Sequence, residues 1–122
     1  MYKGSDLNDM QRLAVETLGQ PVLIFAGAGS GKTRVLTYKV AYLIEEMGMP
    51  SENILAVTFT NKAASEMKKR IHKIVSSNSA NAHIGTFHSI CAGLLRKHIH
   101  HIGYSNDFSI YDQEDSRNVV KQ

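Results

Sequence analysis

Residues 26–33 read Ala26-Gly27-Ala28-Gly29-Ser30-Gly31-Lys32-Thr33. A short apolar run, residues 22–26, leads into this stretch and predicts a strand covered on both faces in a parallel sheet. From residue 32 to residue 47, apolar side chains recur at helical spacing, and Gly48 and Pro50 end the pattern. A glycine-rich loop between a buried strand and a helix is the setting in which a phosphate-binding loop works.

The residue types in this loop suit phosphate binding. Its three glycines allow the backbone to turn its N–H groups inward, and the start of the following helix adds positive dipole toward an anion. Lys32 is expected to reach the β- and γ-phosphates of a nucleotide, and the Thr33 hydroxyl to bind Mg²⁺. Lys32 and Thr33 are therefore the candidate catalytic residues, with Thr33 also the metal contact. Ala26 stands where the usual pattern has glycine, and a glycine-rich turn with an unrelated lysine is the alternative.

The rest of the chain alternates between helical and extended patterns. We expect helices over 8–18, 62–75 and 87–99, strands over 54–59 and 83–86, extended backbone over 108–111, and a last helix from Asp112 through Val120. Asn61 and Asp112 are the expected N-caps of two of these helices. The alternation predicts an α/β domain with a mainly parallel sheet.

Composition limits the class of protein more weakly. The 122 residues are enough for one small domain, and a net charge of +3 permits a polyanionic partner without requiring one. The single cysteine, Cys91, excludes an internal disulfide and is expected to be buried and inert on a helix face. Neither a signal peptide nor an apolar run long enough to span a membrane is present, so we expect a soluble, cytoplasmic protein with no membrane partner.

Four blocks, in order, resemble motifs of the superfamily 1 helicases of the UvrD/Rep type, over essentially the whole chain; they are residues 7–11, 26–34, 56–64 and 85–89. The resemblance implies a P-loop NTPase (RecA-like) three-layer α/β domain with a parallel sheet that is incomplete here. It also implies that residues 1–88 are the first part of motor domain 1A and that residues 89–122 begin a helical insertion, subdomain 1B.

The resemblance assigns nucleotide contacts on both sides of the loop. Gln11 is expected to read the adenine edge, and Arg34 to contact the base or sugar. Each has a plainer alternative. Asn8 and Gln11 have the spacing of a capping box, so Gln11 could bond back to the Asn8 backbone, and Arg34 could be a solvated helix residue. With the loop, the expected nucleotide-binding residues are Gln11, Ala26, Gly27, Ala28, Gly29, Ser30, Gly31, Lys32, Thr33 and Arg34.

Two further blocks are implied to contact single-stranded DNA near a duplex junction. Their expected contact residues are Phe59, Thr60, Asn61, Thr86 and His88. Thr60 and Asn61 sit where a strand gives way to a helix, a place that suits a backbone phosphate, and Phe59 could stack on a base. The alternatives are a buried core position for Phe59 and a helix-start role for His88.

The resemblance implies ATP and Mg²⁺ as cofactors and a 3′-to-5′ DNA helicase or translocase serving DNA repair or replication. Such motors also use an acidic pair at a strand end, and Glu45-Glu46 and Glu114-Asp115 do not follow an apolar strand. We therefore expect a fragment that hydrolyses almost no ATP by itself and whose open sheet edge favours self-association. A complete nucleotide-binding switch or small kinase, and a DNA-binding module without enzymatic activity, are the competing hypotheses; the sequence does not fix the oligomeric state.

Overall fold

The computed structural model describes residues 1–27, 31–75, 81–111 and 113–121. The pattern of contacts between residues divides the chain into two compact units, Met1–Ile90 and Cys91–Gln122. The two units are described separately below. The expected boundary between residues 88 and 89 stays a prediction.

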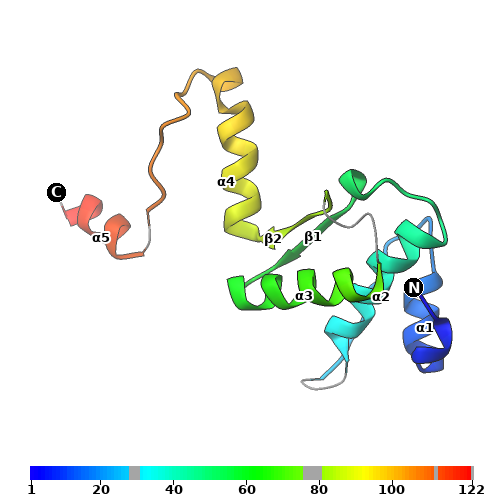
Figure 1. Ribbon diagram of the computed structural model, residues 1–122. Coiled ribbons are helices and arrows are strands. Elements are labelled where there is room, and N and C mark those ends of the chain that lie inside the picture. Colours follow the sequence, from blue (N-terminus) through cyan, green and yellow to red (C-terminus); the bar gives the residue numbers. More distant parts are fainter. Residues whose placement is uncertain (28–30, 76–80, 112, 122) are drawn as a thin grey trace. The chain divides into compact units, whose positions relative to one another are not determined.

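A pair of parallel strands forms the sheet of the first unit. Strand β1 spans Leu55–Thr58 and strand β2 spans His83–Thr86, with Leu55 opposite His83 and Thr58 opposite Thr86. Helix α3, Asn61–Ile74, connects them and packs against both (Figure 1). The strands expected over 54–59 and 83–86 and their parallel pairing are confirmed, in the β-helix-β order that a parallel pair requires.

Three helices form a row beside this sheet. Helix α2, Lys32–Glu45, packs on α3, and helix α1, Asp9–Glu16, packs on α2 (Figure 1). Short 3-10 helices, Gly4–Asp6 and Ser51–Asn53, precede α1 and β1. The described part of the chain is therefore a small α/β structure with a two-stranded parallel sheet and five α-helices.

Local side-chain bonds set where the helices begin. Asn8 caps α1, because its side chain accepts from the Gln11 backbone N–H. The expected cap of α3 is wrong by one residue: Thr60 is the N-cap and its hydroxyl accepts from the Ala63 N–H at 3.1 Å, while Asn61 is the first helical residue. Thr60 takes this position because its extended backbone leaves the hydroxyl within reach of the helix's third N–H.

The core of the first unit lies where α1, α2, α3 and the strands meet. Its most deeply buried apolar side chains come from each of these elements and include Val15, Val40, Ala41, Met67, Ile71 and Ile84. Burial of one apolar face of each helix, rather than helix propensity, is what holds such short helices in place.

The expected strand over residues 22–26 is wrong. Residues 21–27 form neither helix nor strand, and their apolar side chains are exposed, with Leu23 80% and Phe25 91% accessible to solvent. The physical reason is that neither β1 nor β2 pairs with this segment, so among the described residues its backbone has no neighbouring strand to bond with.

The second unit consists of helical segments. Helix α4 spans Phe87–His98 and enters this unit at Cys91; a 3-10 helix, Ile99–Ile102, and helix α5, Gln113–Lys121, follow. The expected cap Asp112 lies outside the described residues, and residues 108–111 form no strand.

Cys91 is exposed, contrary to expectation, because no residue of α4, described over its full length, is buried. Among the described residues, no helix is long and apolar enough to cross a membrane.

Candidate nucleotide- and DNA-binding site

The first turn of α2 presents the two loop residues with the clearest chemistry. Gly31 precedes the helix with φ of 86° and ψ of 24°, a left-handed conformation that glycine adopts without strain. It contributes no capping side chain, which leaves the N–H groups of the first turn directed at whatever lies in front of the helix. Lys32, the first helical residue, is exposed, and Thr33 is partly buried. Ala28, Gly29 and Ser30 lie outside the described residues.

Gln11 lies against this turn while it also caps α1. Its side-chain oxygen accepts from the Asn8 N–H at 3.1 Å, and its backbone N–H donates to the Asn8 side chain at 2.8 Å, so the capping box is present. Its amide nitrogen lies 2.6 Å from the position that a Cβ atom on Gly31 would occupy. The capping bond thus holds the amide nitrogen of Gln11, which is a donor, at the edge of the loop. A capping role for Gln11 is therefore compatible with the contact to adenine expected from the sequence.

An open cleft of about 680 Å³ lies in front of these residues. A volume of this order suits a small ligand. Gln11, Ala26, Gly27, Gly31 and Lys32 line it, as do residues 20–25 and one face of α1. Five of the expected nucleotide contacts therefore share one cleft.

Arg34 is not among the described residues that line this cleft. It lines a second hollow, of about 320 Å³, together with Thr37, Tyr38, Arg70, Lys73 and Ile74. Its guanidinium donates to the Asp6 carbonyl at 2.9 Å and lies over the Tyr38 ring, 5.3 Å from the centroid. Arg34 is exposed, as the solvated-residue alternative expects, and its guanidinium is also bonded to Asp6 and stacked on Tyr38.

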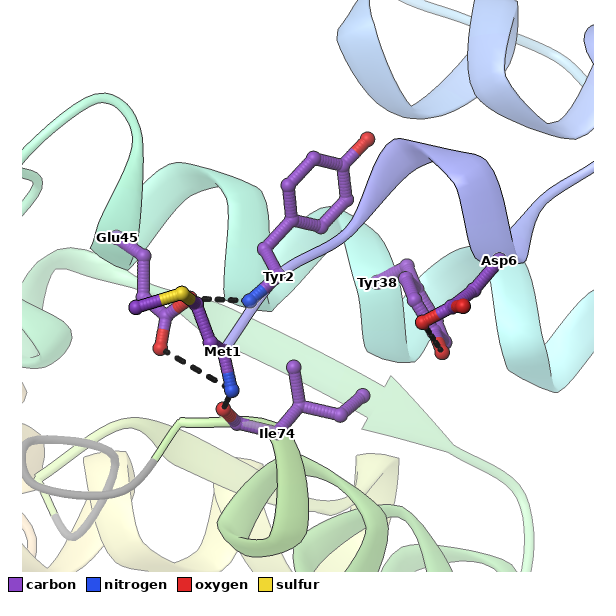
Figure 2. Close-up of polar contacts among 6 residues, drawn as sticks. All are labelled: Met1, Tyr2, Asp6, Tyr38, Glu45 and Ile74. Carbon is purple, nitrogen blue, oxygen red and sulfur yellow. Dashed lines mark hydrogen bonds and ion pairs between the residues drawn. The ribbon is translucent and has the colours of Figure 1, made fainter.

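The N-terminal segment anchors this side of α2 (Figure 2). The Tyr2 ring is 8% exposed and packs edge-on against Tyr38 and Tyr42, and its hydroxyl donates to Glu16 on α1. Burial, followed by the Glu16 carboxylate, raises the pKa of Tyr2 to about 12. The Tyr2 N–H donates to Glu45, and the Met1 amine donates to the Ile74 carbonyl.

The carboxyl ends of β1 and β2 bring the two candidate DNA-contacting segments together. Thr58 pairs with Thr86, so the residues that follow β1 lie beside the start of α4. The Phe59 and Phe87 rings are 5.3 Å apart between centroids, at 40°. Phe59 is 88% exposed, which is contrary to the buried-core alternative, and Phe87 is exposed as well. An exposed aromatic pair of this kind offers a face on which a base can stack.

The polar residues of these segments are not equally accessible. Asn61 and His88 are exposed, and Thr60 is exposed although its hydroxyl caps α3. Thr86 is 6% exposed, and its hydroxyl bonds with Ser89, accepting from the Ser89 N–H at 3.1 Å. The Thr86 hydroxyl thus serves the turn into α4, and any contact with a ligand would require this bond to open.

Charge around the site comes mainly from α3. Its exposed side chains include Lys62, Lys68, Lys69, Arg70 and Lys73. With Glu66 also exposed on this helix, α3 keeps a net positive surface, which is compatible with a polyanionic partner. Within the described ranges, no three His, Cys, Asp or Glu side chains come together in a way that could hold a metal ion.

Comparison with known proteins supplies the family. The sequence profile of the UvrD/REP helicase N-terminal domain matches residues 7–122, which is nearly the whole chain. The chain belongs to the UvrD/REP helicase family.

Relatives within the UvrD/REP family are close in sequence. The ATP-dependent DNA helicase PcrA of Bacillus subtilis strain 168 is 50% identical over 117 residues, covering 96% of this chain and 16% of that protein. PcrA of Staphylococcus aureus strain Mu50 is 48% identical over 115 residues, covering 94% and 16%. The probable DNA helicase II homolog of Mycoplasma capricolum is 50% identical over 115 residues, with the same coverages. The chain thus spans 16% of the length of these UvrD/REP relatives.

Sequence reasoning missed three residues of this UvrD/REP domain that support the site. Asp6 and Tyr38 hold Arg34, and Ser89 holds Thr86. The four-residue spacing of Arg34 and Tyr38 on one helix was a usable signal, because side chains at that spacing meet. Asp6 carries no comparable signal, since its contact with Arg34 is through the backbone.

Proposed function

We propose that this chain is the N-terminal ATP-binding and single-stranded-DNA-contacting part of an ATP-dependent 3′-to-5′ DNA helicase or translocase. Its relatives are named as ATP-dependent DNA helicases. The observation that carries the proposal is the meeting of Gly31 and Lys32 with the Gln11 amide at one cleft, at the start of α2. A helix N-terminus with an adjacent lysine attracts phosphate, and a side-chain amide can read a base edge.

ATP would be held with its phosphates at residues 26–33. Lys32 supplies positive charge to the β- and γ-phosphates, and the Thr33 hydroxyl contributes to holding Mg²⁺. Gln11 contacts the adenine and Arg34 the base or sugar. The Mg²⁺ assignment rests on the chemistry of a threonine that follows the loop lysine, because phosphate and hydroxyl oxygens are the ligands this ion prefers.

The single-stranded DNA, near its junction with duplex, would run over the carboxyl ends of β1 and β2. Phe59 and Phe87 offer their ring faces to bases, and Thr60, Asn61, Thr86 and His88 lie in the same two segments. The start of α3 adds N–H groups for a backbone phosphate. We assign Thr86 a contact that forms once its bonds with Ser89 open, because Ser89 engages its hydroxyl, its backbone N–H and its carbonyl.

Hydrolysis would require groups from the rest of the whole protein. The sequence has no acidic pair after an apolar strand, and this chain spans 16% of its relatives. By itself the chain would bind nucleotide weakly and hydrolyse almost none. In the whole protein, this chain would form part of a three-layer RecA-like P-loop domain, with residues 1–88 in domain 1A and 89–122 beginning subdomain 1B. A cytoplasmic protein acting in DNA repair or replication fits this role.

Strand displacement by the whole protein tests the proposal. Duplexes with a single-stranded tail at only the 3′ or only the 5′ end are mixed with the protein, ATP and Mg²⁺, and release of the labelled strand is followed. We expect ATP-dependent release from the 3′-tailed duplex and little from the 5′-tailed one. Equal release from both would contradict the direction, and no ATP-dependent release from either would contradict the helicase assignment and favour a nucleotide-binding switch.

A further inference from the structure

Arg34, Asp6 and Tyr38 form a closed set of contacts on the exposed side of α2. The Arg34 guanidinium donates to the Asp6 carbonyl at 2.9 Å, and the Tyr38 hydroxyl donates to the Asp6 carboxylate at 3.3 Å (Figure 2 draws the Tyr38–Asp6 bond). The third contact is the Arg34 guanidinium over the Tyr38 ring, with its central carbon 5.3 Å from the ring centroid. An exposed arginine is ordinarily free to sample many rotamers, whereas this one has a bond at one end and an aromatic face beneath it.

The set is fixed to the core and not to a loop tip. Tyr38 lies one helical turn after Arg34 on α2, and its ring meets the buried Tyr2 ring at 6.0 Å. The Tyr38 hydroxyl is protonated and can donate at neutral pH, and burial, followed by the charge of Asp6, raises its pKa further above the ordinary value. The guanidinium is thus held by groups that are themselves held.

The position of Arg34 connects this set to the nucleotide cleft. Its Cβ lies 4.0 Å from the position that a Cβ atom on Gly31 would take, and the Gln11 amide nitrogen lies 2.6 Å from the same position. Arg34 is also two residues beyond Lys32. A guanidinium fixed at this place meets an incoming nucleotide without first losing rotamer freedom, and such preorganisation raises affinity.

We propose that Tyr38 and Asp6 are positioning residues that hold the Arg34 guanidinium for its contact with the base or sugar of the bound nucleotide. The inference rests on the proposed function, because it concerns the same nucleotide site. Tyr38 acts through its ring, and Asp6 acts through its carbonyl on Arg34 and through its carboxylate on Tyr38. Neither touches the reacting phosphates, so both should govern the KM for ATP and not kcat.

The test uses the whole protein and its DNA-stimulated ATP hydrolysis. Tyr38→Ala should raise the KM for ATP about 3- to 10-fold with kcat within about twofold of wild type. Tyr38→Phe keeps the ring under Arg34 and should restore most of the affinity. Tyr42→Ala is the matched control, because Tyr42 lies one turn further along α2 and packs on the same Tyr2 ring without contacting Arg34. It should leave the KM unchanged.

Tripolyphosphate, which has neither base nor sugar, separates positioning from loss of structure. Its inhibition constant should be the same in Tyr38→Ala and wild type, since the phosphate loop is untouched. The Arg34→Ala variant should show the same raised KM as Tyr38→Ala, and the double variant should be no worse than Arg34→Ala alone. A weaker tripolyphosphate affinity in Tyr38→Ala, or additive effects in the double variant, would overturn the inference.

Failure of the inference and failure of the proposed function give different results. If Lys32→Ala loses hydrolysis while Tyr38→Ala keeps the wild-type KM, the inference is overturned and the proposed function stands. If Lys32→Ala still hydrolyses ATP, the proposed function is overturned and the inference with it.

Discussion

The side-chain amide nitrogen of Gln11 lies 2.6 Å from the place where a Cβ atom on Gly31 would sit. Gly31 also has φ of 86°, a backbone conformation that other residues adopt only with strain. Two constraints therefore act on one residue. The backbone constraint concerns the start of α2. The steric constraint concerns the position of the Gln11 amide at the cleft that Gln11, Gly31 and Lys32 line.

Substituting Gly31 separates these constraints when a second glycine serves as control. Gly31→Ala should destabilise the fold by about 1–2 kcal/mol through the left-handed backbone and should also displace Gln11, weakening nucleotide binding. Gly48 has φ of 64° with nothing within 4 Å of its would-be Cβ, so Gly48→Ala should carry only the first effect. Denaturant unfolding and titration with a fluorescent ATP analogue measure the two. Equal nucleotide affinity in both variants would contradict the packing of Gln11 on Gly31.

The exposed Phe59 ring should contribute to binding of single-stranded DNA. Phe59→Ala should weaken the affinity by about 1–3 kcal/mol, the range found for a base stacked on an aromatic side chain, and leave ATP hydrolysis without DNA unchanged. Phe59→Trp keeps a stacking face and is the matched control. Fluorescence anisotropy with a labelled oligonucleotide gives the affinities. A wild-type affinity in Phe59→Ala would remove Phe59 from the DNA path.

Most helices and two of the strands could be predicted because the sequence signals that define them are local. The apolar spacing of α1, α2 and α3 and the capping position of Asn8 depend on neighbours within a few residues. The strand expected over residues 22–26 did not form. An apolar run indicates that a segment is suited to burial, but whether it is buried as a strand depends on partner strands. The expected burial of Cys91 failed for the same reason, since no described residue buries its side chain on α4.

The candidate site could be predicted where a motif fixes residue type and spacing. Gln11, Gly31 and Lys32 were expected at one site and line one cleft. The hold on Arg34 depends on a backbone carbonyl 28 residues earlier in the chain, and no sequence pattern encodes such a contact. The burial of Thr86 was not predicted, because a serine three residues later does not by itself indicate that its hydroxyl bonds with the threonine.

Alkaline pH should weaken the fold through Tyr2. The folded-state pKa of Tyr2 is raised from 10.0 to about 12, so between these values the unfolded chain loses a proton that the folded chain keeps. The contribution is fully present below pH 10 and is lost as the pH rises toward 12. Tyr2→Phe should reduce the fall in the free energy of unfolding across this window, measured by urea denaturation at several pH values. Tyr104→Phe, which removes an exposed hydroxyl, is the control, and identical slopes in Tyr2→Phe and wild type would contradict the prediction.

The isolated 122-residue chain should self-associate through residues 22–26. Leu23 and Phe25 are 80% and 91% exposed, and residues 22–26 join no strand in the described part of the chain, which favours contact with a second copy. Analytical ultracentrifugation should detect concentration-dependent association that the Leu23→Ser, Phe25→Ser double variant reduces. Ile102→Ser, at an exposed apolar residue of the second unit, should have no effect. A compact, stable monomer at all concentrations would contradict the prediction.

The role of Lys32 is the most direct test of the central claim, that residues 26–33 drive an ATP-dependent DNA motor. In the whole protein, ATP hydrolysis with and without single-stranded DNA is measured for wild type, Lys32→Ala and Lys97→Ala, the last removing an exposed lysine of the second unit. We predict that Lys32→Ala abolishes DNA-stimulated hydrolysis while its affinity for single-stranded DNA survives, and that Lys97→Ala matches wild type. Hydrolysis retained in Lys32→Ala would contradict the account.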